Sequence, residues 1–232
     1  MKKLQFVVIL LITSVLILSC ASNETSDSNK VAQSEIYQSY FVNYDASDNE
    51  LEVSAGFRFG GQNGTTLRLV EKSNVTYNNL KMNASTSAWT GTSYIYKMNG
   101  SVGSEHKFVY TNNDDEVFEN SIPLLKAEPV LKNAVISKSQ GTAIYWTGMP
   151  LSNKDQIEVI IQDSAQTYSF FPKFVGAASL SLSPNNLELL KLGKGQIYIR
   201  RSVTLSLQKG KPIGGVIGSE YQSNKIMCEL VK

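Results

Sequence analysis

The stretch QIYIRRSVTLSLQ (196–208) decides the fold class, because hydrophobic residues recur in it at every second position. One face of this stretch carries Ile197, Ile199, Val203, Leu205 and Leu207. A period of two is typical of a β-strand that buries one face and exposes the other. Arg201 is the one charged residue on the hydrophobic face. It indicates a bulge or a change of partner strand at that point.

The same alternation recurs along most of the chain. It is clear in LEVSAGFRF (51–59) and QIEVI (156–160), and turn-forming Gly, Asn and Asp residues separate such stretches, as in GGQNG (60–64). Further strands are expected near 37–44, 65–70, 73–78, 93–98, 106–111, 117–122, 141–147 and 226–231. Only SPNNLELLKLG (183–193) has a helical pattern, with a capping Ser followed by Pro. The sequence therefore predicts an all-β protein of two antiparallel β-sandwiches with one short helix.

The N-terminal stretch MKKLQFVVILLITSVLILSC (1–20) has two lysines followed by an apolar run of fifteen residues. A helix that spans a bilayer needs about 20 apolar residues, so this run predicts a secretion signal. Its last four residues, ILSC (17–20), resemble the lipobox of bacterial lipoproteins. The resemblance implies that residues 1–19 are removed and that Cys20 carries a diacylglycerol lipid. Ordinary signal-peptide cleavage after Ala21 is the alternative.

Residues 20–34 are expected to form a flexible tether that begins at the lipidated Cys20. They contain no aromatic residue and only Val31 as a large aliphatic one, so they have little surface to bury. Pro123 and Pro129 bracket a linker between two domains, which we place at residues 35–122 and 123–232. Both resemble immunoglobulin-like or fibronectin-like domains only in strand count and in one candidate buried tryptophan, Trp146, a resemblance that implies no function.

The charge of the chain excludes a class of partner. The signal contains two of the 22 basic residues and none of the 20 acidic ones, so the mature chain has 20 of each. Nucleic-acid binders need a positive surplus to displace counterions, so no nucleic-acid partner is predicted. Residues 35–122 have six basic and eleven acidic residues, whereas 123–232 have thirteen and seven. Two domains of opposite charge are expected to attract each other within the chain.

Side chains suited to catalysis are few. His106 is the only histidine, and its place among alternating aromatic residues favours a structural role over that of a catalytic base. Cys228 alternates with hydrophobic residues and is expected to be buried. Neither the Rossmann nor the P-loop pattern is present, so no cofactor is predicted. The chain is therefore predicted not to be an enzyme.

Three weaker candidates for binding remain. The acids Asp114, Asp115 and Glu116 are a weak candidate for metal binding, but their spacing does not match an EF-hand and a hairpin turn is favoured. Basic residues gather around one predicted hairpin and could contact acidic groups of a partner. A solvated face, or pairing of these residues within the chain, is favoured instead. The residues proposed for binding are Arg200, Arg201, Lys209 and Lys211. In YSFFPKF (168–174), alternation sends Phe171 outward and the other aromatic rings inward, so Phe171 is a candidate contact residue, although packing of these rings in the core is favoured.

These patterns favour a non-catalytic module anchored in the bacterial cell envelope, on the periplasmic side or the cell surface. Its partners are expected to be the membrane, through the N-terminal lipid, and an envelope protein or glycan. Two alternatives stay open. One is a carbohydrate-active enzyme that uses acids such as Asp114 or Glu116, and the other is an inert structural spacer.

Overall fold

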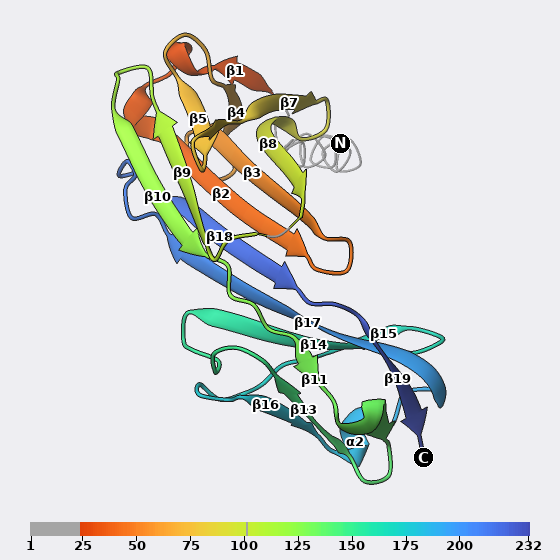
Figure 1. Cartoon of the computed structure of the whole chain (residues 1–232). Coiled ribbons are helices and arrows are strands. Elements are labelled where there is room, and N and C mark those ends of the chain that lie inside the picture. The colour runs from red at the N-terminus through yellow and green to blue at the C-terminus, as the bar shows by residue number, and fades with distance from the viewer. Residues whose placement is uncertain (1–23, 101) are drawn as a thin grey trace, which may run out of the picture.

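The computed structural model describes residues 24–100 and 102–232, so the signal and Cys20 lie outside the described part. Figure 1 shows an elongated, all-β molecule with two bodies stacked end to end. The predicted all-β sandwich fold is confirmed. Within the described residues, α2 (Pro184–Leu187) is the only α-helix, shorter than the stretch that predicted it. No helix in these ranges has the length and hydropathy needed to cross a bilayer.

The first sandwich, at the N-terminal end, has two layers around one hydrophobic core. Its larger layer contains β1 (Thr25–Asp27), β4 (Thr65–Arg68), β3 (Glu50–Phe59), β2 (Ile36–Asp45) and β18 (Gly215–Gln222), with β8 (Gly91–Asn99) beside β3 and β7 (Asn83–Ser87) beside β8. Its smaller layer contains β10 (Val117–Pro123), β9 (Glu105–Thr111), β5 (Asn74–Tyr77) and β6 (Leu80–Lys81). Aromatic rings join the layers, and the ring centroids of Phe57 and Tyr110 are 4.4 Å apart.

The second sandwich packs around a separate core that contains the predicted buried Trp146. One layer is formed by β12 (Val135–Ser137), β19 (Ile226–Val231), β17 (Gly193–Ser206), β14 (Asp155–Gln162) and β15 (Thr167–Phe170). The other is formed by β11 (Pro129–Val130), β13 (Thr142–Trp146) and β16 (Ser179–Leu182), with α2 beside β16. Three short 3-10 turns complete the chain: η1 (Ser28–Lys30), η2 (Gln33–Glu35) and η3 (Lys132–Ala134).

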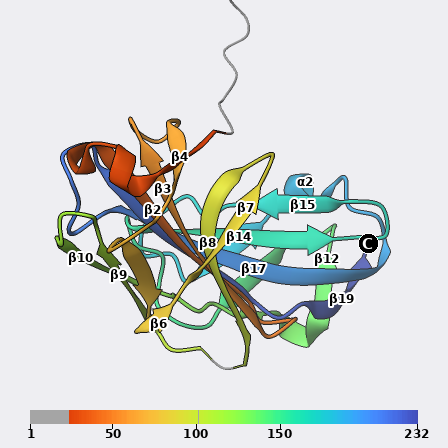
Figure 2. The same ribbon diagram turned by 90° about the horizontal axis from the view of Figure 1, so that it is seen from above.

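Strand β17 belongs to both sandwiches, and Figure 2 shows that the second-sandwich strands β14 and β15 run across the direction of β2 and β3. Ile197 and Ile199 lie in the second core, whereas Val203 lies in the first. Between them β17 changes partner along one edge, from β19 at residues 193–197 to β18 at residues 200–206. Of the two possibilities that Arg201 indicated in the sequence, the structure has the change of partner strand. It has no bulge there, because Arg201 pairs in regular register with Ile157 of β14 and with Tyr221 of β18.

The C-terminal part of the chain returns to the first sandwich, because β18 pairs with β2 in parallel. Ile217 and Tyr221 are consequently buried in the first core. The boundary near residue 122 stays a prediction, but the first core draws on residues from beyond it. Two further parallel pairs, β1 with β4 and β12 with β19, also differ from the purely antiparallel sheets that we expected.

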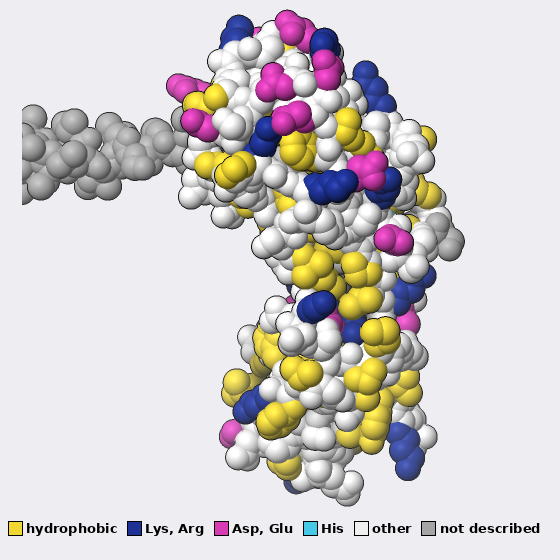
Figure 3. Space-filling model, turned by 90° about the vertical axis from the view of Figure 1, so that its left-hand side faces the viewer, with side chains coloured by type: hydrophobic (Ala, Val, Ile, Leu, Met, Phe, Trp, Pro, Cys, Tyr) yellow, Lys and Arg dark blue, Asp and Glu magenta, His cyan; other side chains and the backbone are white. Residues whose placement is uncertain are grey.

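The surfaces of the two sandwiches differ in character. Figure 3 shows charged side chains spread over the first sandwich and many hydrophobic side chains over the second. Most of the large hydrophobic residues that are exposed belong to the second sandwich, namely Val130, Tyr145, Met149, Phe171, Phe174, Val175, Leu189, Leu192 and Met227. An apolar surface of this kind is common where a protein binds a partner.

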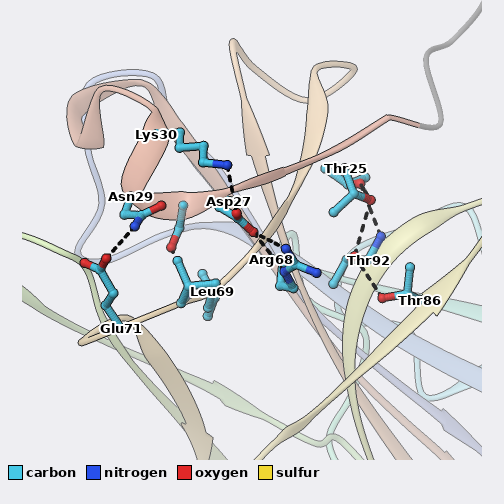
Figure 4. Close-up of polar contacts among 12 residues, drawn as sticks. Thr25, Asp27, Asn29, Lys30, Arg68, Leu69, Glu71, Thr86 and Thr92 are labelled. Carbon is cyan, nitrogen blue, oxygen red and sulfur yellow. Dashed lines mark hydrogen bonds and ion pairs between the residues drawn. The ribbon is translucent and has the colours of Figure 1, made fainter.

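The tether expected over residues 20–34 is wrong from Glu24 onward. Thr25–Asp27 form β1, which pairs with β4, and Figure 4 shows this segment bound to its neighbours by polar side chains. Ser28 is fully buried, donates a hydrogen bond to Asn113 (2.8 Å) and accepts one from the backbone N–H of Val70 (3.1 Å). Composition predicted disorder because the segment lacks large apolar residues, but hydrogen bonds hold it in place.

Candidate binding site

A crevice of about 690 Å³ opens between β15 and β16, at one side of the second sandwich. Among the described strands, each of these two has a single paired neighbour, β14 for β15 and β13 for β16, so within this part of the chain each has one free edge. The lining residues are Ser169, Phe170, Phe171, Pro172, Lys173, Phe174, Ala177, Ser179, Leu180, Ser181, Leu182 and Asn186. All four residues of β16 are among them. Because side chains alternate between faces of a strand, this places the free edge of β16 along the crevice.

The floor of the crevice is the side of the second core. Phe170 on β15 and Leu180 on β16 are half-buried and pack against that core, and Leu182 is buried in it. The sandwich is therefore not closed at this side, because the two sheets are joined here only by the loop of residues 171–178. A half-buried apolar floor favours ligands that bring apolar groups of their own.

The loop that closes one end of the crevice exposes two aromatic rings. Phe171 is 47% exposed, the orientation that alternation gives and not the core packing that was favoured, and Phe174 is 76% exposed, contrary to the inward orientation that alternation predicted. The reason is that β15 ends at Phe170, before Pro172, so the period of two stops there. Two backbone hydrogen bonds with Leu151 fix the loop, from the N–H of Leu151 to Ala177 (2.8 Å) and from the N–H of Gly176 to Leu151 (2.7 Å).

The crevice has little charge. Lys173 is the one charged residue that lines it, and no Asp, Glu, His or Cys is present among its lining residues. Its polar groups are three serine hydroxyls, the Asn186 amide and the free backbone of the two strand edges. This set suits binding through hydrogen bonds and apolar contacts, and it lacks the acid and base that hydrolysis requires.

A second hollow, of about 410 Å³, lies on the first sandwich and is acidic, with Asp45, Asp48, Glu50, Glu52 and Glu220 around it. Lys97 pairs with both Glu50 and Glu52 there. In residues 24–100 and 102–232, no group of three or more His, Cys, Asp or Glu residues is arranged to hold a metal ion. We therefore do not assign a site to this hollow.

The structure places the predicted basic residues apart. Arg200 lies on the outer face of β17 beside Glu158 (3.5 Å) and Glu220 (3.8 Å). Arg201 is buried and pairs with the buried carboxylate of Asp155 at 2.8 Å, so it is wrong as a surface contact residue. Its guanidinium group also donates to the carbonyl groups of Met149 and Pro150.

Lys209 and Lys211 lie in the loop between β17 and β18, against the first sandwich. Lys211 pairs with Glu116 at 2.5 Å, and the backbone N–H of Lys209 donates to Asn120. The Lys211 ammonium group lowers the pKa of Glu116 below its ordinary value. Lys211 is therefore paired within the chain, whereas only the backbone of Lys209 is held and its side chain is exposed.

The acids considered for metal binding form a hairpin turn between β9 and β10. Asp115 pairs with Lys72 at 2.5 Å and Glu116 with Lys211. The buried side chain of Asn112 accepts hydrogen bonds from the backbone N–H groups of Asp114 (3.0 Å) and Glu116 (2.9 Å). The residues thus form an Asx turn in which Asp115 and Glu116 are bound to lysines, and such turns are common in hairpins.

His106 and Cys228 are both buried. His106 stacks on Tyr77 and its Nδ1 atom is hydrogen-bonded to the Tyr77 hydroxyl group. Burial lowers the pKa of His106 and raises the pKa of the Cys228 thiol. Both shifts favour the neutral side chain, as expected of residues that pack a core. Cys20, the predicted lipidation site, lies outside the described residues.

Comparisons with known proteins give fold likenesses only. No family model matches the chain, and no curated protein matches it. One similar solved structure concerns host cell surface retention of a 1.5-MDa bacterial ice-binding adhesin, at 10% identity and a TM-score of 0.23, covering 85% of this chain and 65% of that one. Another is a Ca2+-stabilized adhesin with which an Antarctic bacterium binds ice, at 12% identity and a TM-score of 0.25, covering 84% of this chain and 49% of that one.

A third is SGBP-B of a Bacteroides ovatus mixed-linkage glucan utilization locus, solved with a mixed-linkage heptasaccharide. It has 9% identity and a TM-score of 0.19, and the match covers 81% of this chain and 60% of that one. The chain thus spans between about half and two thirds of the length of these proteins. Likenesses this weak carry no argument about ligand. The chain is identified by its fold alone, as an all-β protein of two sandwiches that share one strand.

Proposed function

We propose that this protein is a non-catalytic binding module of the bacterial cell envelope, and that it binds an extended segment of a partner polypeptide in the crevice between β15 and β16. The observation that carries the proposal is the geometry of the crevice. It is bounded by two free strand edges and has an apolar floor, two exposed phenylalanine rings and almost no charge.

A free strand edge presents a row of backbone N–H and C=O groups, which another extended chain pairs with most readily. Peptides bind many sheets by adding a strand in this way, with pockets beside the edge that accept alternate side chains. Here Phe171 and Phe174 stand at one end of the free edge of β16, and Phe170 and Leu180 form the apolar floor. An added strand would supply hydrogen bonds to the edge and apolar side chains to this floor.

The enzyme alternative relies on Asp114 and Glu116, which belong to the first sandwich and take part in a turn. Glu116 is bound to Lys211, and neither acid lines the crevice. A general acid or base acts only within hydrogen-bond reach of its substrate, so these acids have no role in the crevice. This favours binding over catalysis.

The place in the envelope rests on the N-terminal sequence. We propose that Cys20 is the first residue of the mature protein and carries the lipid that anchors it, as its resemblance to the lipobox implies. Mass spectrometry of the mature N-terminus tests this directly, since a diacylglycerol on Cys20 adds a fixed mass. A Cys20→Ala variant is expected to leave the membrane fraction, and its retention there would contradict the anchor.

The test of binding uses the mature protein and a displayed library of random peptides, followed by dissociation constants for the selected sequences. Selected peptides are expected to alternate apolar and polar residues. Because complete burial of a phenylalanine is worth about 1.5–3 kcal/mol and both rings are already partly buried, Phe171→Ala and Phe174→Ala should each weaken binding by roughly 1–2 kcal/mol, or about five- to thirtyfold.

Leu189→Ala is the matched control, because Leu189 is 73% exposed but does not line the crevice. Its effect should lie within about twofold of the wild type. A panel of neutral and acidic polysaccharides is tested in parallel. Glycan binding that Phe171→Ala abolishes, with no peptide selected, would show that the ligand is a glycan and that strand addition is wrong. Release of sugars by the protein would favour the enzyme alternative.

A further inference from the structure

The turn between β7 and β8 carries Trp89, whose side chain is 84% exposed, more than any other large hydrophobic residue of the described ranges. Tryptophan is a large, mostly apolar residue that proteins usually bury. It is enriched where one side of a protein meets the interface between lipid and water. An indole exposed at the tip of a hairpin is placed to enter such an interface.

This hairpin tip lies beside the first described residues of the chain. The Thr92 hydroxyl is hydrogen-bonded to those of Thr25 (3.3 Å) and Thr86 (3.1 Å), as Figure 4 shows. Gly91 enforces the close packing, because its φ is +72° and a Cβ there would lie 2.2 Å from the Thr66 hydroxyl oxygen. The position of the hairpin relative to β1 is therefore fixed by contacts among β1, β4, β7 and β8.

The hairpin itself carries no charged side chain, and Glu24 is the charged residue beside it. Residues 82–96, which contain β7, the turn and the start of β8, include no Asp, Glu, Lys or Arg. The neighbouring GGQNG turn (60–64) between β3 and β4 has none either. The absence of charge matters because moving a charged group out of water is costly, whereas an uncharged tip with an exposed indole enters a lipid headgroup layer at little cost.

The lipid on Cys20 would hold this end close to a bilayer. Only four peptide units separate Cys20 from Glu24, and a fully extended chain spans at most about 3.6 Å per residue, or roughly 14 Å here. The expected long tether does not exist from Glu24 onward, since β1 is part of the first sheet. The first sandwich consequently has no means of standing far from the membrane.

We propose that the end of the first sandwich formed by the β7–β8 hairpin is the membrane-facing surface of the anchored protein, with Trp89 in the headgroup layer. The inference rests on the lipid anchor of the proposed function. It gives the molecule an orientation, because the hairpin belongs to the first sandwich, and Figure 1 shows the second sandwich as a separate body stacked on the first. The crevice between β15 and β16 then belongs to the body that is farther from the bilayer.

The test uses the lipidated mature protein in vesicles of phosphatidylethanolamine and phosphatidylglycerol, with or without phospholipids brominated near the headgroup. The chain has two tryptophans, and Trp146 is buried with no hydrogen-bond partner for its Nε1 atom, so Trp146→Phe leaves Trp89 as the sole indole at little structural cost. Brominated lipid is expected to quench Trp89, and its emission is expected to shift to shorter wavelength compared with protein in detergent.

Two controls make the result specific. In a Trp89→Phe, Trp146→Phe background, Phe174→Trp places an exposed indole on the second sandwich, and brominated lipid should leave its emission unchanged. A Gly/Ser insertion of about ten residues after Asn23 lengthens the connection to the lipid and should reduce quenching of Trp89 while the protein still floats with the vesicles.

The outcomes separate the two proposals. Protein that does not float with vesicles refutes the lipid anchor and this inference with it. Protein that floats while Trp89 escapes quenching and keeps its emission wavelength refutes the membrane-facing surface alone. Equal quenching of the indoles at positions 89 and 174 would also refute the proposed orientation.

Discussion

Removal of one partner from the ion pair between Arg201 and Asp155, at the junction of the two sandwiches, is predicted to lower the free energy of unfolding by several kcal/mol. Both side chains are almost completely buried, at 1% and 0% exposure. The guanidinium group donates to the Asp155 carboxylate at 2.8 Å and to the carbonyl groups of Met149 (2.8 Å) and Pro150 (3.2 Å). Arg201→Met fills much of the same volume but leaves the carboxylate and two carbonyl groups without their donor.

Removal of one member of a buried pair costs about 3–5 kcal/mol, because the remaining charge has no compensation. After Arg201→Met, Asp155 would retain only its hydrogen bonds with Ser152. The double variant Arg201→Met, Asp155→Leu removes both charges, and such replacements are often neutral or stabilising. The double variant is therefore expected to be more stable than Arg201→Met alone, with a coupling energy of roughly 2 kcal/mol or more.

Urea unfolding in a Trp89→Phe background, followed by far-UV circular dichroism and by Trp146 fluorescence, measures these differences. With a slope of about 1–3 kcal/mol per molar urea, a loss of 3–5 kcal/mol lowers the midpoint by roughly 1 M or more. Arg201→Lys should lie between the wild type and Arg201→Met, since an ammonium group keeps the charge but not the planar set of donors. A loss below about 1 kcal/mol for Arg201→Met, or additive effects in the double variant, would refute the reasoning.

Three further predictions concern single side chains. Burial lowers the pKa of His106 in the folded state. The free energy of unfolding should therefore fall as the pH drops from about 6.5, the ordinary pKa of histidine, to the lowered pKa. Because His106 is the only histidine, His106→Phe should remove this pH dependence from urea unfolding measured over that range. Burial alone would raise the pKa of Asp163, but hydrogen bonds from backbone N–H groups outweigh burial and hold this pKa below its usual value. Asp163→Asn should therefore lower the free energy of unfolding at pH 7. The free energy of unfolding of the variant should approach that of the wild type as the pH falls below about 4. Ser28→Ala should cost about 1–3 kcal/mol, because Val70 loses the acceptor for its N–H group, and hydrogen exchange in β1 should accelerate; unchanged exchange would show that Ser28 does not hold the segment.

Strands that alternate over many residues were predictable from the sequence, because burial of one face is a local property of such a strand. The predicted stretches 51–59 and 196–208 correspond to β3 and β17, and the strand near 226–231 corresponds to β19. Short strands such as β7, whose residues are nearly all exposed, have no hydrophobic face. Their place in the sheet depends on pairing with a neighbour, and a single sequence gives no sign of that pairing.

The candidate site was only partly predictable. Alternation indicated an exposed Phe171 but not an exposed Phe174, because the exposure of Phe174 depends on where β15 ends. The Pro at position 172 is the signal that could have shown the strand ending early. The four basic residues proposed as binding residues appeared as one patch in the sequence, because the acids that pair with them are distant along the chain. In the fold, Arg201 pairs with Asp155 and Lys211 with Glu116.

The parallel pairing of β2 with β18 has a consequence for how the chain is made. Gly215 pairs with Gln38, so the sheet of the first sandwich gains its last central neighbour only when nearly the whole polypeptide exists. At about 5–20 residues per second, a ribosome needs on the order of ten to forty seconds between these two positions. The N-terminal half must wait that long before its native sheet is complete, and a fragment that stops at residue 122 would expose the β2 edge and the core side chains that β18 covers.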